Sequence, residues 1–258
     1  MANYYFLIAA LPPLTFGVKA EISFKELKEI LKLNLTPQDA REVKRLLMPI
    51  DLYNIRALWL GLPIDERGNY EAKSLEEELL VQSSLPLYLV DFLERYESAQ
   101  DRVRYFPSLF ASLYRDELSQ LKGFNRQYYQ FERELRLVLA AFRAKRQDRD
   151  LVRELQFEDP ADPFVAQILA QKDAAEYTPP AEYEELKTLF IDNVSEPLRL
   201  HQAILQYRFN KLEEMEENQG FGIDRVLCYI ARLMVVESLA DLDKEQGMMA
   251  VEQLSQYG

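Results

Sequence analysis

Apolar side chains recur every three or four residues along most of the chain, which is the pattern of amphipathic helices. The clearest case covers residues 124–146. There the apolar positions step by four and three along one helical face: Phe124, Tyr128, Phe131, Leu135, Val138 and Phe142. Two further helices are predicted over 198–217 and 223–239. Alternating apolar and polar positions, the mark of half-buried strands, are missing. Only Tyr4–Leu11 and Glu21–Phe24 also allow extended backbone, so the sequence predicts an all-α fold of tandem helical bundles.

Several helix starts are marked by capping residues. Ser23–Glu26 and Ser74–Glu77 have the spacing of a capping box, in which a serine and a glutamate satisfy free N–H groups reciprocally. Thr36–Pro37 and Asp162–Pro163 place a capping side chain before a proline at the first helical position. We expect a helix to begin at each of these four places.

Polar connections separate the helices and suggest how the chain is organised. The longest connection, from Gly61 to Ala72, is predicted to be a mobile loop. We predict one helical protein, 1–258, with three bundle-like units. Their approximate bounds are 1–72, 73–160 and 161–258.

Polar residues interrupt the apolar stripes of several helices. Asp51 and Asn54 fall on the stripe that carries Leu47 and Leu58. A buried carboxylate is costly unless it is paired or hydrogen-bonded. A helix that turns an acid and an amide inward therefore needs a polar partner for them.

Two other helices repeat the arrangement. Glu237 continues the apolar stripe of Ile230 and Met234, and Glu134 shares a face with Phe131 and Val138. A small residue follows each acid by ten positions: Gly61 after Asp51, Ala144 after Glu134 and Gly247 after Glu237. We interpret Asp51, Asn54, Glu134 and Glu237 as buried structural groups that cap or brace a neighbouring helix, whose first N–H groups lack partners. The alternative is that the spacing is a coincidence in a chain rich in acids.

The charge balance argues against some classes of binding partner. The formal net charge is -12 at pH 7, which disfavours direct binding of nucleic acid and of anionic membrane surfaces. The single cysteine, Cys228, excludes an internal disulfide and fits the reducing cytoplasm. The apolar stretch Tyr4–Leu11 is too short to span a bilayer and lacks the basic residues of a signal peptide. We expect it to be a short segment buried in the body of the protein.

Residues that carry chemistry are scarce. The single histidine, His201, lies near an apolar stripe and is interpreted as a packed or hydrogen-bonded residue. No glycine-rich phosphate loop and no cluster of His and Cys ligands is present, so no cofactor or metal is predicted. The remaining enzymatic alternative is an all-carboxylate metal site built from Glu132, Glu134 and Glu237. It lacks the histidines that usually complete such sites in helical bundles.

Two stretches resemble a known family. "DLYNIRALWLG", with Asp51 and Asn54, and the segment from Gly222 through Tyr229 to Glu237 are similar to the C-subunit family of V-type and archaeal-type ATPases, whose eukaryotic members are the d-subunits. The opening "NYYFLIAALPPLTFG" resembles a smaller bacterial family encoded beside V-type ATPase genes in chlamydiae and Bacteroides-like bacteria.

The resemblance implies a role without catalysis. In the C-subunit family, three helical bundles form a socket for the rotor shaft, which is made of the D and F subunits, and rest on the membrane ring of proteolipid subunits. It implies that this chain is a cytoplasmic coupling component for ion transport, peripheral to the inner membrane through its complex. The alternative is a helical adaptor or assembly factor that is not part of the rotor.

Overall fold

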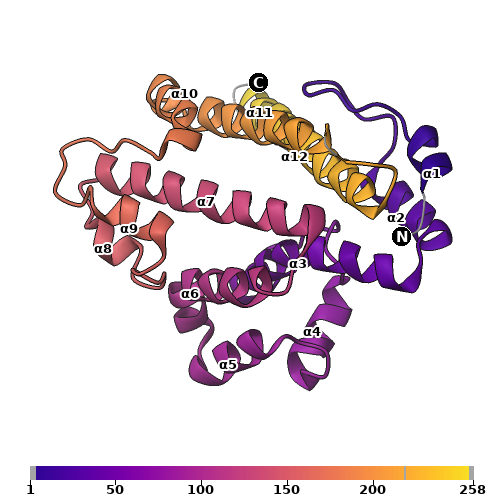
Figure 1. Ribbon diagram of the computed structural model, residues 1–258, viewed down its shortest axis with the longest axis horizontal. Coiled ribbons are helices and arrows are strands. Elements are labelled where there is room, and N and C mark those ends of the chain that lie inside the picture. Colours follow the sequence, from indigo (N-terminus) through magenta and orange to yellow (C-terminus); the bar gives the residue numbers. More distant parts are fainter. Residues whose placement is uncertain (1–3, 218, 256–258) are drawn as a thin grey trace. The chain divides into compact units, whose positions relative to one another are not determined.

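The computed structural model describes residues 4–217 and 219–255, and of residues 243–255 it describes the backbone alone. Within these ranges the chain forms twelve α-helices and no strand, which confirms the all-α prediction (Figure 1). The helices are α1 Tyr5–Ala10, α2 Phe24–Asn34, α3 Pro37–Leu60, α4 Ala72–Val81, α5 Leu87–Arg95, α6 Ala99–Leu118, α7 Gly123–Arg146, α8 Leu151–Glu154, α9 Pro163–Leu169, α10 Glu185–Asn193, α11 Pro197–Glu216 and α12 Ile223–Ser255. A short 3₁₀ turn covers Ala181–Tyr183.

The chain divides into two compact units. Unit 1 combines residues 1–46 with 193–258, and unit 2 is the continuous stretch 47–192. The three consecutive units predicted from the sequence do not coincide with these two, because the first and last helices of the chain belong together. Helix α3 contributes its first residues to unit 1 and the rest to unit 2.

Unit 1 is built around its last helix. Helix α12 packs along α11 and also contacts α2 (Figure 1). Along the predicted stripe of α12, Leu227, Ile230 and Met234 are buried. Helix α2 contributes Leu27 and Leu31, and α11 contributes Phe209 and other apolar residues, to the buried set of this unit. Burial of these side chains is the main favourable contribution to folding of unit 1.

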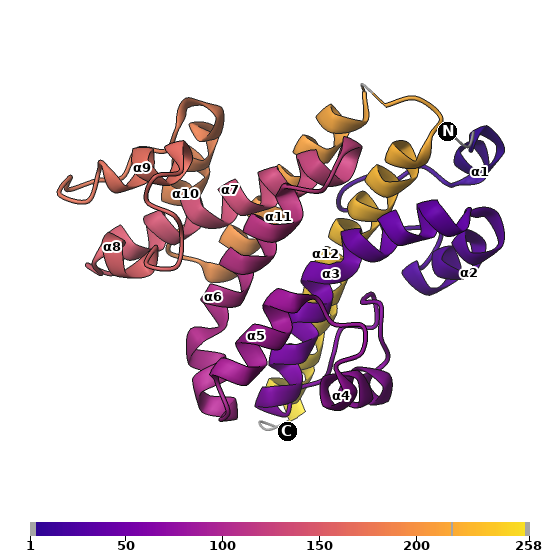
Figure 2. The ribbon, with the colours of Figure 1, turned by 60° about the horizontal axis from the view of Figure 1, so that its bottom comes forward.

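Unit 2 has an aromatic-rich core. Residues from α3 to α7 form it: Leu52, Ile55, Leu75, Tyr88, Leu89, Phe92, Leu93, Phe106, Leu109, Phe110, Leu113, Tyr114, Leu121 and Tyr129. Helices α8 and α9 pack against the long helix α7 near its C-terminal end (Figure 2). The predicted helix over 124–146 is confirmed by α7, whose inner face holds the fully buried Leu135 and Val138.

Three of the four predicted helix starts are confirmed. Ser23 and Glu26 form the capping box of α2, Thr36 accepts a hydrogen bond from the N–H of Asp39 at the start of α3, and Asp162 caps α9. The prediction for Ser74 is wrong. Helix α4 already begins at Ala72, and the Ser74 hydroxyl donates to the carbonyl of Glu71 inside the first turn.

The N-terminal stretch differs from its prediction. Residues Tyr5–Ala10 form helix α1, so the extended alternative is wrong there, and only part of the segment is enclosed. Tyr4 and Leu7 are buried, whereas Phe6 is 86% exposed. A single short helix can bury only one of its faces. In the described part of the chain, no helix is both long enough and apolar enough to span a membrane.

Candidate functional site

The Asp51 carboxylate is buried and fastens the connection between α3 and α4. The residue is only 6% exposed. Its Oδ1 accepts a hydrogen bond from the backbone N–H of Asn69 at 2.7 Å, and its Oδ2 accepts one from Nδ2 of Asn69 at 2.6 Å. Hydrogen bonds to a charged acceptor are stronger than neutral ones. Two such bonds offset the cost of enclosing the carboxylate.

Asn54, one helical turn later, holds the same connection at a second point. Its Oδ1 accepts from the N–H of Asp65 at 2.7 Å, and its Nδ2 donates to the Asp65 carbonyl at 2.9 Å. The side chain thus pairs with both backbone groups of one residue and is 1% exposed. Arg67 closes the turn through an ion pair of 2.8 Å with the Asp65 carboxylate. The connection predicted to be mobile is therefore anchored to α3.

Gly68 allows this close approach. A Cβ atom at Gly68 would lie 2.7 Å from Oδ1 of Asp51 and 2.7 Å from Nδ2 of Asn54, closer than any side chain can be accommodated. The requirement is for space, because the φ angle of Gly68 is not among the positive ones. We call the group of Asp51, Asn54, Asp65, Gly68 and Asn69 the loop brace.

In unit 1, Glu237 caps a neighbouring helix, which is the role that the sequence analysis proposed for Asp51, Glu134 and Glu237. Its Oε1 accepts a hydrogen bond from the backbone N–H of Phe24 at 2.7 Å. Phe24 is the first residue of α2, so the carboxylate lies at the N-terminus of a neighbouring helix, where N–H groups lack partners and negative charge is favoured. Glu237 itself is half-buried.

Other polar groups on α12 hold the segment that precedes α2. The Tyr229 hydroxyl donates to the carbonyl of Pro12 at 2.9 Å, and Nη2 of Arg232 donates to the carbonyl of Leu14 at 3.2 Å. A tyrosine hydroxyl is protonated at neutral pH and can donate, and burial raises the pKa of Tyr229 further, to about 12. Together with Glu237, these groups fasten the N-terminal segment to α12 at three points along the helix. We call them the α12 fastenings.

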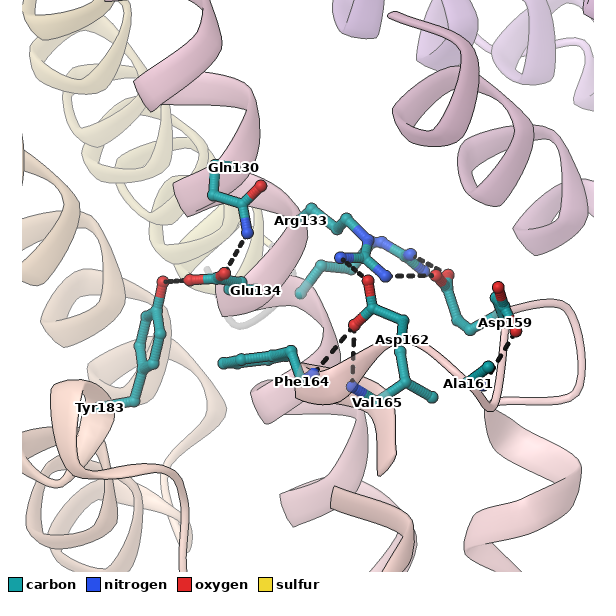
Figure 3. Close-up of polar contacts among 11 residues, drawn as sticks. Gln130, Arg133, Glu134, Asp159, Ala161, Asp162, Phe164, Val165 and Tyr183 are labelled. Atoms are coloured by element: carbon teal, nitrogen blue, oxygen red, sulfur yellow. Dashed lines mark hydrogen bonds and ion pairs between the residues drawn. The ribbon is translucent and has the colours of Figure 1, made fainter. Parts of the chain in front are cut away.

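Glu134 binds a phenol in unit 2. One of its oxygens accepts from the Tyr183 hydroxyl at 2.7 Å, and the other accepts from the side chain of Gln130 one turn earlier on α7 (Figure 3). The residue is half-buried. Tyr183 belongs to the 3₁₀ turn, so this acid fastens a connection and not a helix start.

An ion network beside Glu134 was not foreseen from the sequence. Arg133 is buried, and its Nη1 lies 3.1 Å from Oδ2 of Asp162 while its Nη2 lies 3.6 Å from Oε2 of Glu158. Arg136 pairs with the other oxygen of Glu158. The second oxygen of Asp162, Oδ1, accepts from the N–H groups of Phe164 and Val165 and thereby caps α9 (Figure 3). One carboxylate thus caps a helix and binds that helix to α7.

The small residues ten positions after the acids have no common role. Gly61 ends α3 with a φ of 66°, a left-handed conformation suited to glycine. Ala144 is buried inside α7, and Gly247 lies within the backbone of α12. The proposed repeat of acid and small residue is therefore wrong as a shared structural unit, although each acid does engage a partner.

The structure also places the candidates for chemistry. His201 is exposed, so of the two predicted roles, packed or hydrogen-bonded, the packed one is wrong. Among the described residues, no group of three or more His, Cys, Asp or Glu side chains is placed to hold a metal ion, and this includes Glu132, Glu134 and Glu237. Cys228 is enclosed, its Sγ lies 3.2 Å from the Leu212 carbonyl, and burial raises its pKa to about 12.

Comparison with known proteins finds one family and three similar chlamydial chains. The family model described as "Protein of unknown function (DUF2764)" matches residues 1–256. A Chlamydia muridarum protein is 32% identical over 241 residues, covering 91% of each chain. A Chlamydia trachomatis protein is 32% identical over 248 residues, covering 92% of each, and a Chlamydia pneumoniae protein is 31% identical over 252 residues, covering 95% of each. All three bear the name "Uncharacterized protein". No solved structure matches the chain.

Proposed function

The chain belongs to the DUF2764 family, and we propose that it is a non-catalytic coupling component of a bacterial V-type ATPase, similar to the C-subunit family. In this role it links the rotor shaft, made of the D and F subunits, to the proteolipid ring and carries out no chemical step of its own. Its place is on the cytoplasmic side of the inner membrane, to which it is attached through the complex.

The observation that carries the proposal is the use of the motif residues. The residues that resemble the C-subunit family are Asp51, Asn54, Tyr229 and Glu237. Each of them points its polar end at another part of its own unit. A protein that transmits torque needs rigid connections between its helices. Hydrogen bonds from polar side chains to other parts of the same unit provide that rigidity. A catalytic role would require such groups to face a substrate.

The relatives add support of a different kind. All three come from chlamydiae. This is one of the bacterial groups in which the family that the N-terminal stretch resembles is encoded beside V-type ATPase genes. Because they cover more than nine-tenths of the chain, the similarity extends over both units.

Purification of the ATPase tests the proposal. The V-type ATPase is isolated from a bacterium that encodes this chain, through an affinity tag on its ATP-hydrolysing subunit, and the components are quantified by mass spectrometry. We expect this chain in a fixed ratio to the rotor-shaft proteins through every purification step. Deletion of its gene should abolish ATP-driven ion transport, while the detached soluble sector still hydrolyses ATP.

Two outcomes distinguish other roles. A complete complex that transports ions and never contains the chain contradicts the proposal. If the chain is bound to incomplete complexes and is lost from the mature one, it is an assembly factor and not part of the rotor.

A further inference from the structure

Three large apolar side chains are exposed where α4 leads into α5. Leu80 and Val81, at the end of α4, are 84% and 70% exposed, and Leu87, at the start of α5, is 73% exposed. Only five residues separate Val81 from Leu87. We call Leu80, Val81 and Leu87 the α4–α5 tip, after the two helices, which are labelled in Figure 2. Single exposed apolar residues are ordinary on protein surfaces, but a group of them that is held in place suggests contact with a partner.

The surrounding structure fixes the tip. Leu75 on α4 and Leu89 on α5 are buried in the core of unit 2, so both helices are anchored on their inner faces. The connection is tied back to α4, because the N–H of Ser84 donates to Oε1 of Glu78 at 2.6 Å. Gln82 takes up a left-handed conformation with a φ of 58°, which ends α4 at Val81. The exposure of the tip follows from this arrangement.

Acidic residues outnumber basic ones along α4, α5 and their connection, and three of them lie one helical turn from the tip. From Glu71 to Arg95 the chain has six acidic residues and only two basic ones, Lys73 and Arg95. Nζ of Lys73 lies 3.9 Å from Oε1 of Glu77. The acids also share the exposed faces of the tip residues. Exposed Glu76 and Glu77 lie one turn before Leu80 on α4, and exposed Asp91 lies one turn after Leu87 on α5.

We propose that the α4–α5 tip binds a basic amphipathic helix of another protein. An apolar surface bordered by carboxylates complements a helix that carries leucine-like residues on one stripe and lysine or arginine at its edges. The apolar side chains supply the contact, and the acids select the partner by charge and speed its approach. This inference does not depend on the proposed function, since it uses only the composition and exposure of the tip.

A peptide binding experiment tests the surface. The probe is a fluorescent helical peptide of about 18 residues, made only of leucine and lysine, with the leucines on one stripe. We expect it to bind the full-length chain, with affinity falling as salt is raised. A peptide of the same composition with its leucines spread around the helix should bind more weakly, and a leucine–glutamate helix should not bind.

Substitutions locate the contact. The triple variant Leu80→Ser, Val81→Ser, Leu87→Ser should bind the leucine–lysine helix about tenfold more weakly or worse, since each side chain loses apolar burial. Leu33→Ser is the matched control, because Leu33 is 87% exposed on α2 in unit 1, and its binding should be unchanged. The variant Glu76→Gln, Glu77→Gln, Asp91→Asn should weaken binding and reduce its dependence on salt. Circular dichroism should give the same helical content for all of these proteins.

Three results would overturn the inference. These are no binding of the leucine–lysine helix, equal binding by the triple variant and Leu33→Ser, or binding of the leucine–glutamate helix as tightly as the basic one. Equal binding by the triple variant would show that the peptide responds only to the net negative charge of the chain.

Discussion

The loop brace of unit 2 and the α12 fastenings of unit 1 use the same kind of residue in different ways. In the loop brace, the Asp51 carboxylate is enclosed and both of its oxygens bind Asn69. In the α12 fastenings, the Glu237 carboxylate is half-buried and lies at the start of α2. The first holds an irregular connection in place, and the second extends the cap of a regular helix.

The comparison indicates that the burial of a carboxylate determines how much stability is lost when the carboxylate is removed. The Asp51 side chain is buried, and removal of its carboxylate takes the acceptor away from both the N–H and the Nδ2 of Asn69. Helix α2 has its own capping box, formed by the exposed side chains of Ser23 and Glu26. Removal of Glu237 should therefore be tolerated better, and four substitutions test this ranking.

Asp51→Ala should have the largest effect. It leaves the N–H and the Nδ2 of Asn69 without acceptors, which should lower the free energy of unfolding by about 3–4 kcal/mol. Urea denaturation followed by fluorescence of Trp59, the single tryptophan, reports on unit 2. Asp51→Asn keeps one acceptor oxygen and should cost less than the alanine variant. Equal stability of wild type and Asp51→Ala would mean that the loop brace contributes nothing.

Gly68→Ala should come next, at about 2 kcal/mol, since the added methyl group must displace Asp51 or Asn54. The control is Gly220→Ala, where a Cβ would meet no atom within 4 Å and where little change is expected. Thermal unfolding of the two variants measures the difference. If both tolerate alanine equally, the close approach at Gly68 does not constrain the fold.

Glu237→Ala should cost about 1 kcal/mol, the usual scale for a helix-start interaction. The loss should appear as faster hydrogen exchange in the first turn of α2 and not at Trp59. Ser23→Ala, which removes the cap of the same helix, is the companion variant. A loss at Glu237 as large as that of Asp51→Ala would remove the distinction between the two regions.

Tyr183→Phe should have the smallest effect, about 0.5–1 kcal/mol, because it removes one hydrogen bond to a half-buried acid that keeps Gln130 as a second partner. Glu134→Gln in the same background measures the coupling between the two side chains. If the effects of the two substitutions simply add, the hydrogen bond contributes no coupling energy.

The long helices and most helix starts of this fold could be predicted from local sequence patterns. The stripe of α7 and the capping residues Ser23, Thr36 and Asp162 depend on neighbours within one or two turns, and the structure confirms them. Ser74 shows the limit of such patterns, since its spacing to Glu77 also occurs inside a helix.

Contacts between segments that are distant in the sequence could not be predicted in the same way. An acid on an apolar stripe indicates that a partner exists, but nothing in the sequence identifies Asn69 for Asp51 or Phe24 for Glu237. Nothing in the sequence indicated that Arg133 is buried and forms ion pairs. Its partners, Glu158 and Asp162, follow in a connection whose path depends on the packing of α8 and α9.

Hydrogen exchange at the backbone amide of Asn69 tests the central claim, that the inward carboxylates are internal fastenings, most directly. In the wild-type chain this amide donates to Asp51 and should exchange about tenfold or more slowly than in Asp51→Ala, with the amide of Asp65 protected by Asn54 in both proteins. Equal and fast exchange of Asn69 in the two proteins would contradict the account.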